Sequence, residues 1–195
     1  MNTPVATDQL SATMAPSILA YKILCSGYIP RPFDPSSRFR ILGLHALATV
    51  SVIRRHLNKG FKLIGIERAG RGFRLDLLFE SQTNKIRLVE VKSARILREI
   101  HLVQGALYYR PDSGVDEIAV SNRQADQVLT SQYILDVAEK AEKVMNLLRN
   151  NPVTAATSYT PNSECRYCSN SKCPWLPLAN SLNTRTPRQD ESSAK

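Results

Sequence analysis

The segment LVEVKSARILREIHLVQGALYY, residues 88–109, decides the fold and raises the main functional question. Its first part has the apolar composition of an inner strand, yet it carries Glu90 and Lys92. Charge is rare in such a strand unless it is paired or functional, because burial of an unpaired charge is costly. The second part spaces its apolar residues as a helix does. The segment therefore predicts a strand that carries a charged site and leads into a helix.

The sequence on either side of this segment predicts an α/β domain built around a hairpin. The turn residues SQTN at 81–84 separate two strand patterns, which favours an antiparallel pair. From residue 92 the chain is expected to cross over through a helix to a further strand. The expected helices are 36–58, 95–109 and 124–149, and the expected strands are 62–67, 72–80, 85–92 and 117–120.

The helix expected at 36–58 begins after Asp34 and Pro35, a favourable N-cap and first-turn pair. It is apolar nearly all round from residue 41 to residue 53, which predicts a buried helix. His45 lies inside this stretch and is either a hydrogen-bonded core residue or, as a neutral imidazole, a metal ligand. His56, near the helix end, is expected to be a solvated basic residue.

Composition and charge narrow the class of protein. The 195 residues suffice for one domain, expected to span 1–178 and to be followed by a polar, disordered tail at 179–195. Lys and Arg outnumber Asp and Glu by 26 to 17, which favours a polyanionic partner such as nucleic acid. We expect no signal peptide and no membrane span, and hence a cytoplasmic protein.

Two carboxylates are expected to meet across the hairpin. Folding about the turn places Asp76 opposite residue 89 or residue 90. In the second register Asp76 and Glu90 are direct neighbours, with Cβ atoms about 5 Å apart. Like charges so close favour a divalent cation such as Mg²⁺ or Mn²⁺, and Lys92 would then activate water or stabilise charge on a phosphate. The alternative is an exposed hairpin whose Glu–Lys pair contributes little.

Polar residues follow one line of the next helix. Ile96, Ile100, Val103 and Leu107 form its expected core stripe. Gln104 and Tyr108 are i, i+4 neighbours at the edge of that stripe, where they would overlook whatever the sheet presents. The alternative for both is an ordinary amphipathic helix edge.

The four cysteines form a second constellation. Cys165, Cys168 and Cys173 have the spacing C-x₂-C-x₄-C, whereas Cys25 lies near the other end of the chain. In a reducing compartment such a set favours metal ligation over disulfides. Four thiolates hold either zinc or an iron–sulfur cluster, and the spacing leaves both open. Unrelated thiols are the remaining alternative.

The motifs occur in one order along the chain, which is Cys25, His45, Asp76, Glu90–Val91–Lys92, Gln104-x-x-x-Tyr108 and then Cys165, Cys168 and Cys173. This series resembles the RecB-like branch of the PD-(D/E)xK nuclease superfamily. With the cysteines it is similar to the iron–sulfur members of that branch, above all to the fourth CRISPR-associated protein family. Related cores occur in the AddB subunit of bacterial helicase–nucleases. The resemblance covers about residues 20–177.

The resemblance implies a restriction-endonuclease-like core, in which a mixed sheet is flanked by helices and an iron–sulfur cluster staples the N- and C-terminal segments. It implies that His45, Asp76, Glu90 and the Val91 carbonyl bind Mn²⁺ or Mg²⁺, and that Lys92 is the catalytic lysine. With Gln104 and Tyr108 as the family's Q-x-x-x-Y motif, the implied catalytic set is Asp76, Glu90, Lys92, Gln104 and Tyr108. The implied ligands of a [4Fe–4S] cluster are Cys25, Cys165, Cys168 and Cys173.

The implied activity is exonucleolytic cleavage of single-stranded DNA in the 5′ to 3′ direction. The implied setting is the processing of DNA fragments before CRISPR spacer acquisition, with the CRISPR integrase proteins as partners and a homo-oligomer as an allowed state. The alternatives are a viral or repair RecB-like nuclease outside CRISPR and a non-catalytic nucleic-acid-binding protein with an iron–sulfur or zinc centre.

Overall fold

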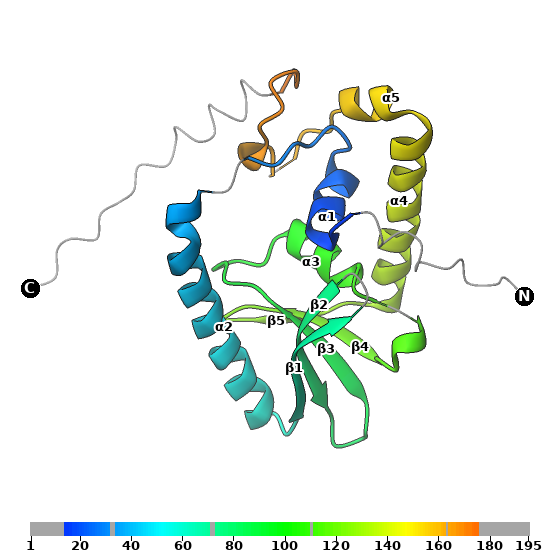
Figure 1. The fold of residues 1–195 in the computed structure, drawn as a ribbon. Coiled ribbons are helices and arrows are strands. Elements are labelled where there is room, and N and C mark those ends of the chain that lie inside the picture. Colours follow the sequence, from blue (N-terminus) through cyan, green and yellow to red (C-terminus); the bar gives the residue numbers. More distant parts are fainter. Residues whose placement is uncertain (1–13, 32–33, 71–72, 110, 163, 176–195) are drawn as a thin grey trace, which may run out of the picture.

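The computed structural model describes residues 14–31, 34–70, 73–109, 111–162 and 164–175 (Figure 1). The tail expected at 179–195 lies outside the described residues. The helices are α1 (Pro16–Leu24), α2 (Arg38–Asn58), α3 (Glu99–Ala106), α4 (Ser131–Asn150) and α5 (Pro152–Thr157), with short 3₁₀ turns η2 (Pro35–Ser37), η3 (Pro111–Ser113) and η4 (Cys165–Tyr167). The strands are β1 (Lys62–Gly70), β2 (Phe73–Glu80), β3 (Ile86–Val91), β4 (Glu117–Ser121) and β5 (Asp126–Val128).

The strands form one mixed sheet in the order β1-β2-β3-β4-β5. The first three strands pair antiparallel, β3 and β4 pair parallel, and β5 returns antiparallel to β4. The chain crosses from β3 to β4 through α3, as parallel neighbours require. The expected α/β class, the central hairpin and the crossover are confirmed. No helix in the described part of the chain is long and apolar enough to span a membrane.

Alternate residues of the strands face two separate cores, as strand geometry requires. One core lies between the sheet and the group α1, α3 and α4, and it contains Leu78 and Leu88. The other lies between the sheet and α2, and it contains Phe79 and Val89. Figure 1 shows α2 running along the sheet, apart from α1, α3 and α4. Glu90 lies two residues from Leu88 and therefore points to the α3 side.

Two expected helices were too long. The expected helix at 95–109 begins only at Glu99, because His101 Nδ1 accepts the Arg98 backbone N–H and closes the first turn there. Ile96, expected in the core stripe, lies before this turn and is exposed. The expected helix at 124–149 begins at Ser131, because residues 126–128 are extended and pair with β4 as β5.

The expectation that α2 is buried was wrong. Its buried residues Ala48, Val52 and His56 recur every four positions, so a single stripe meets the sheet. Much of the remaining apolar surface faces solvent, and Phe39 is 85% exposed and Val50 65% exposed. An all-round apolar pattern predicts burial only where neighbours cover every side, and here the sheet covers one side.

His56 was expected in solvent but is fully buried, because it falls on that stripe. Its Nδ1 lies 3.0 Å from the Val52 carbonyl oxygen, and its ring stacks on Phe79 at a centroid distance of 4.6 Å. Burial lowers the pKa of His56 below its ordinary value, so the imidazole is neutral and contributes to the core.

Candidate active site and cysteine pocket

The two carboxylates lie on neighbouring strands at the same level. Leu77 of β2 is opposite Val89 of β3, and the same register continued by one residue places Asp76 opposite Glu90. The second of the two registers predicted from the sequence is therefore the one that forms. The Asp76 carboxylate lies close enough to contribute to the raised pKa of Glu90.

Glu90 is a buried acid, with 4% of its surface exposed. Burial is the largest cause that raises its pKa, to about 7, and the Asp76 carboxylate acts in the same direction while Lys92 opposes both. Glu90 Oε1 accepts hydrogen bonds from Lys92 Nζ at 2.6 Å and from Gln104 Nε2 at 3.1 Å. Two donors therefore hold the Glu90 carboxylate, although burial disfavours its ionised form.

Lys92, Gln104 and Tyr108 form a hydrogen-bonded series above the strands. Lys92 Nζ donates to Gln104 Oε1 at 2.6 Å, and Gln104 Nε2 donates to the Tyr108 hydroxyl at 3.3 Å. Burial, with the Glu90 carboxylate, raises the pKa of Tyr108 to about 12, so its hydroxyl keeps its proton. The Lys92 backbone N–H is fixed by the Ser121 carbonyl of β4 at 2.7 Å. The polar line of α3 thus faces the charged strand.

His45 reaches the same place from α2. Its Nε2 lies 3.9 Å from Asp76 Oδ1, and its side chain is about one-third exposed. The other oxygen, Asp76 Oδ2, accepts the backbone N–H of Val91 at 2.7 Å. The structure therefore brings His45, Asp76, Glu90 and Val91 into one neighbourhood, with the imidazole at its open side.

The donor chemistry of this neighbourhood suits a hard divalent cation, since carboxylate oxygens dominate it. The raised pKa of Glu90 is the structural sign of fit, because a cation between Asp76 and Glu90 would favour the ionised form that burial now disfavours. Among the described residues, no group of three or more His, Cys, Asp or Glu side chains is arranged to hold a metal ion. The carboxylate and imidazole donors therefore lie near one another, but they do not surround one common point as the ligands of a bound ion do.

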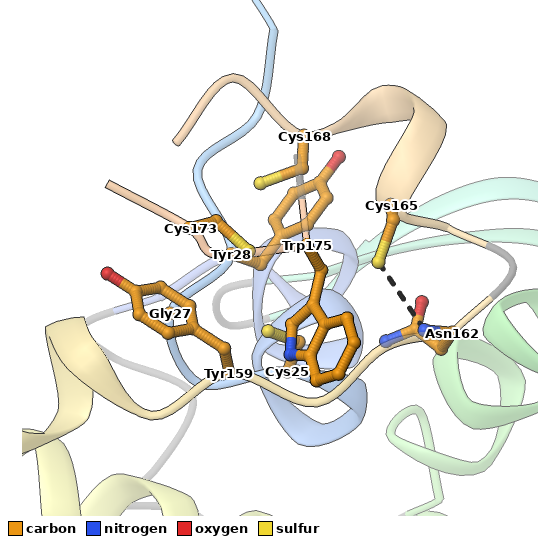
Figure 2. A pocket seen from close by; sticks show the side chains of 9 residues that line it. All are labelled: Cys25, Gly27, Tyr28, Tyr159, Asn162, Cys165, Cys168, Cys173 and Trp175. Atoms are coloured by element: carbon orange, nitrogen blue, oxygen red, sulfur yellow. Dashed lines mark hydrogen bonds between the residues drawn. The ribbon is translucent and has the colours of Figure 1, made fainter. Parts of the chain in front are cut away.

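All four cysteines line one pocket, although Cys25 is about 140 residues from the others along the chain (Figure 2). The other residues that line it are Gly27, Tyr28, Tyr159, Asn162 and Trp175. Burial raises the pKa of Cys25, and the neighbouring thiols Cys165 and Cys168 also raise it. The sequence grouping of one remote and three close cysteines therefore corresponds to one place in the fold.

Backbone amides surround the sulfur atoms of this pocket. Cys25 Sγ accepts the Thr160 N–H at 3.5 Å, and Cys165 Sγ accepts the Asn162 N–H at 3.4 Å. Cys168 Sγ accepts two N–H groups, from Ile29 and Asn170, at 3.5 and 3.4 Å. Such donors stabilise thiolates, the form that binds zinc or an iron–sulfur cluster, so the pocket has the donor chemistry of either centre, although its described thiols are not drawn together into a ligand set.

Backbone pairing also joins the two ends of the chain at this pocket. Pro30 and Cys168 form an antiparallel bridge, and Ser169 N–H donates to the Ile29 carbonyl at 2.8 Å. The Tyr28 hydroxyl donates to the Tyr167 carbonyl at 3.1 Å. The N- and C-terminal segments are therefore held together by the protein itself, before any contribution from a metal centre.

The sequence reasoning missed Arg98 and Glu164. Glu164 is 1% exposed, and its Oε2 accepts Arg98 Nη1 at 2.9 Å. One signal was available, because Glu164 is an acid placed directly before Cys165 in an otherwise basic segment. Its partner on the loop before α3 could not be identified from sequence, since 66 residues separate the two.

No protein-family model matches this chain, and no curated protein matches it in sequence.

Proposed function

We propose that this protein is a metal-dependent nuclease that cleaves single-stranded DNA. The observation that carries the proposal is the buried Glu90 beside Asp76, in contact with Lys92 and Gln104. A buried acid with a raised pKa next to a second carboxylate and a lysine is typical of a reaction centre, where such shifts cluster. The exposed hairpin considered from sequence is contradicted, because Glu90 is not exposed.

In the proposed mechanism Asp76, Glu90 and His45 would hold Mg²⁺ or Mn²⁺, with the Val91 carbonyl as a further oxygen donor. When bound, the ion would acidify a water molecule and polarise the phosphate. Lys92 orients the attacking water and offsets the charge that develops on the phosphate oxygens. The Lys92 ammonium is kept in place by Gln104, at 2.6 Å.

Tyr108 supports this arrangement from the turn that directly follows α3. Its hydroxyl accepts from Gln104 Nε2, which fixes the amide so that its oxygen faces Lys92. Since the pKa of Tyr108 is raised to about 12, we do not assign it a proton-transfer role at neutral pH. We assign Gln104 and Tyr108 to the orientation of the catalytic lysine.

The surface of α2 suits a single strand. The helix carries exposed arginines at 38, 40 and 54 and has no acidic residue along its length. Phe39 lies between Arg38 and Arg40 in the sequence, and 85% of its surface is exposed. Phosphates pair with arginines and bases stack on aromatic rings, whereas a duplex hides its bases. His45, on the same helix, would bring such a strand to the carboxylates.

The cysteine pocket is proposed to hold a [4Fe–4S] cluster that stabilises the joined ends of the chain. Because it lies apart from the carboxylates in sequence and on separate elements, we assign it no role in the hydrolysis itself. The motif resemblance supports 5′ to 3′ exonuclease activity in CRISPR spacer acquisition, beside the integrase proteins.

The test is degradation of single-stranded DNA labelled at either end, with anaerobically purified protein. Reactions contain Mn²⁺, Mg²⁺ or a chelator, and wild type is compared with Lys92→Ala and Lys85→Ala. Lys85 is the matched control, because it is an exposed lysine on the turn of the same hairpin. We expect metal-dependent shortening from the 5′ end that is lost in Lys92→Ala and retained in Lys85→Ala.

Two outcomes would contradict the proposal. Full cleavage by a folded Lys92→Ala protein removes the assigned role of this lysine. Binding of the strand without cleavage, by folded protein with a fully loaded metal centre, favours the non-catalytic nucleic-acid-binding alternative.

A further inference from the structure

A buried ion pair joins the cysteine pocket to the helix of the candidate active site. Arg98 Nη1 donates to Glu164 Oε2 at 2.9 Å, and Glu164 is the residue directly before Cys165. The side chain of Glu164 is 2% exposed and that of Arg98 is 23% exposed. Such a pair fixes its partners more firmly than one at the surface, since the buried Glu164 carboxylate has no water to replace Arg98.

Arg98 is well placed to transmit position into α3. It is the N-cap residue of this helix, and its backbone N–H donates to His101 Nδ1 at 3.1 Å. Its guanidinium also lies over the Tyr167 ring, 5.0 Å from the centroid. One residue therefore contacts both the first turn of α3 and the segment between Cys165 and Cys168.

The cysteine end of the connection is equally direct. Asn162 Oδ1 accepts the Glu164 N–H at 2.8 Å, while the Asn162 N–H donates to Cys165 Sγ at 3.4 Å. The positions of Cys165 and Glu164 are thus set by the same short turn. A centre bound by Cys165 would hold that turn, whereas an empty pocket leaves it to the hydrogen bonds alone.

The other end of α3 carries the residues that orient Lys92. Gln104 follows Arg98 by six positions, under two turns of helix, and contacts both Lys92 and Glu90. The helix packs tightly on β4, since a Cβ added at Gly105 would lie 2.4 Å from Val120 Cγ2. A shift at Arg98 therefore moves Gln104 against a close-packed strand.

We propose that Arg98 and Glu164 are positioning residues that make the placement of α3 depend on whether a metal centre occupies the cysteine pocket. With the pocket filled, the pair holds α3 so that Gln104 orients Lys92. With the pocket empty, the first turn of α3 loosens and the lysine loses its alignment. The effect on cleavage rests on the proposed nuclease function, but the effect on α3 does not.

The first experiment measures hydrogen exchange in the full chain, with the metal centre loaded and after its removal, without added Mn²⁺. In wild type we expect emptying the pocket to speed amide exchange at residues 99–106 about tenfold or more. The reference is the C-terminal half of α2, which packs on the other face of the sheet and should change less than twofold. In Glu164→Gln and Arg98→Lys, amide exchange at α3 should be fast even with the metal centre loaded, and it should not change when the centre is removed.

The second experiment compares iron and zinc content, kcat and KM in the same variants. Arg95→Lys is the matched control, because Arg95 is exposed on the same loop and its carbonyl, which accepts from Asn122 Nδ2, is kept in the variant. We expect Arg98→Lys and Glu164→Gln to keep the metal content of wild type, to lose kcat about fivefold or more, and to change KM less than twofold. Arg95→Lys should match wild type.

Equal exchange at α3 in loaded and emptied wild type overturns the inference, whatever the activity. Should Glu164→Gln fail to load its metal centre, Arg98→Lys, which lies outside the cysteine segment, decides the case. An α3 response in a protein that cleaves no DNA upholds the coupling and refutes the proposed function instead. Cleavage without any change in amide exchange at α3 supports the proposed function and refutes the coupling.

Discussion

Replacement of Glu90 by Gln should stabilise the metal-free protein at alkaline pH while removing its response to Mn²⁺. Glutamine keeps the size of the side chain and an oxygen for Lys92, but it cannot ionise. The buried carboxyl, with 4% of its surface exposed, is thereby relieved of a charge that its surroundings disfavour.

The magnitude follows from the pKa. Burial, with Asp76, raises the pKa of Glu90 from its ordinary 4.5 to about 7. Each pKa unit is worth about 1.4 kcal/mol, so the free energy of unfolding falls by about 3 kcal/mol through this one group. Below pH 4.5 the acid is protonated in both states and costs nothing. The cost grows as the pH rises from about 4.5 to 7 and is complete at about pH 8.

The assay is urea unfolding of wild type and Glu90→Gln between pH 5 and pH 8.5, in chelator. The difference between the two free energies cancels the titrating groups that do not interact with Glu90, so it reports Glu90 together with its charged neighbours. It should shift by about 2.5 kcal/mol in favour of the variant over this range, because part of the cost is already present at pH 5. Added Mn²⁺ at pH 8 should then stabilise wild type alone. Glu139→Gln, which removes an exposed carboxylate of α4, is the control and should give a flat difference. Parallel pH profiles for wild type and Glu90→Gln would refute the reasoning.

Four further substitutions test the fold and the cysteine pocket. Gly105→Ala places a Cβ 2.4 Å from a methyl group of β4 and should cost about 1–3 kcal/mol by chemical denaturation, whereas Gly43→Ala, whose Cβ meets nothing within 4 Å, should stabilise α2 by up to about 1 kcal/mol. Arg55→Ala leaves the Asp126 carboxylate, 8% exposed, with one fewer cation and should cost about 3 kcal/mol at pH 7 by urea unfolding. Because Arg55 and other donors lower the pKa of Asp126, the cost should shrink as the pH falls below 4. With the proposed metal centre in the cysteine pocket, Cys173→Ser should lose that metal and lower Tm in calorimetry, and a metal content equal to that of wild type would contradict its proposed place among the ligands.

The hairpin and the crossover were predictable because short-range rules determine them. Turn residues at 81–84 and period-two alternation set the pairing of β2 with β3, and a strand–helix–strand order dictates a parallel neighbour. β5 was missed for a tertiary reason. Asp126 is drawn to Arg55, Lys59 and Ser121, which extends the chain where local propensity indicates helix.

For the candidate site, sequence rules place residues on common faces but do not give the contacts between them. Strand parity places Glu90 and Lys92 on one face, and helix periodicity places Gln104 and Tyr108 on one line. That the line of α3 meets the face of β3 depends on helix packing, which no local pattern reports. The Arg98–Glu164 pair could not be predicted for the same reason, because a contact between residues 66 positions apart produces no periodic pattern in the sequence.

The physical cost of Glu90 answers the question raised by the charged strand. An apolar residue between Val89 and Val91 would fill the same space, whereas the carboxyl costs about 3 kcal/mol when it ionises. Lys92 lies 2.6 Å away and still does not bring the pKa back to its ordinary value. A salt bridge therefore does not account for this acid. We propose that a divalent cation beside Asp76 would account for it, because its two charges would favour ionisation of both carboxylates at once and make Glu90 a ligand.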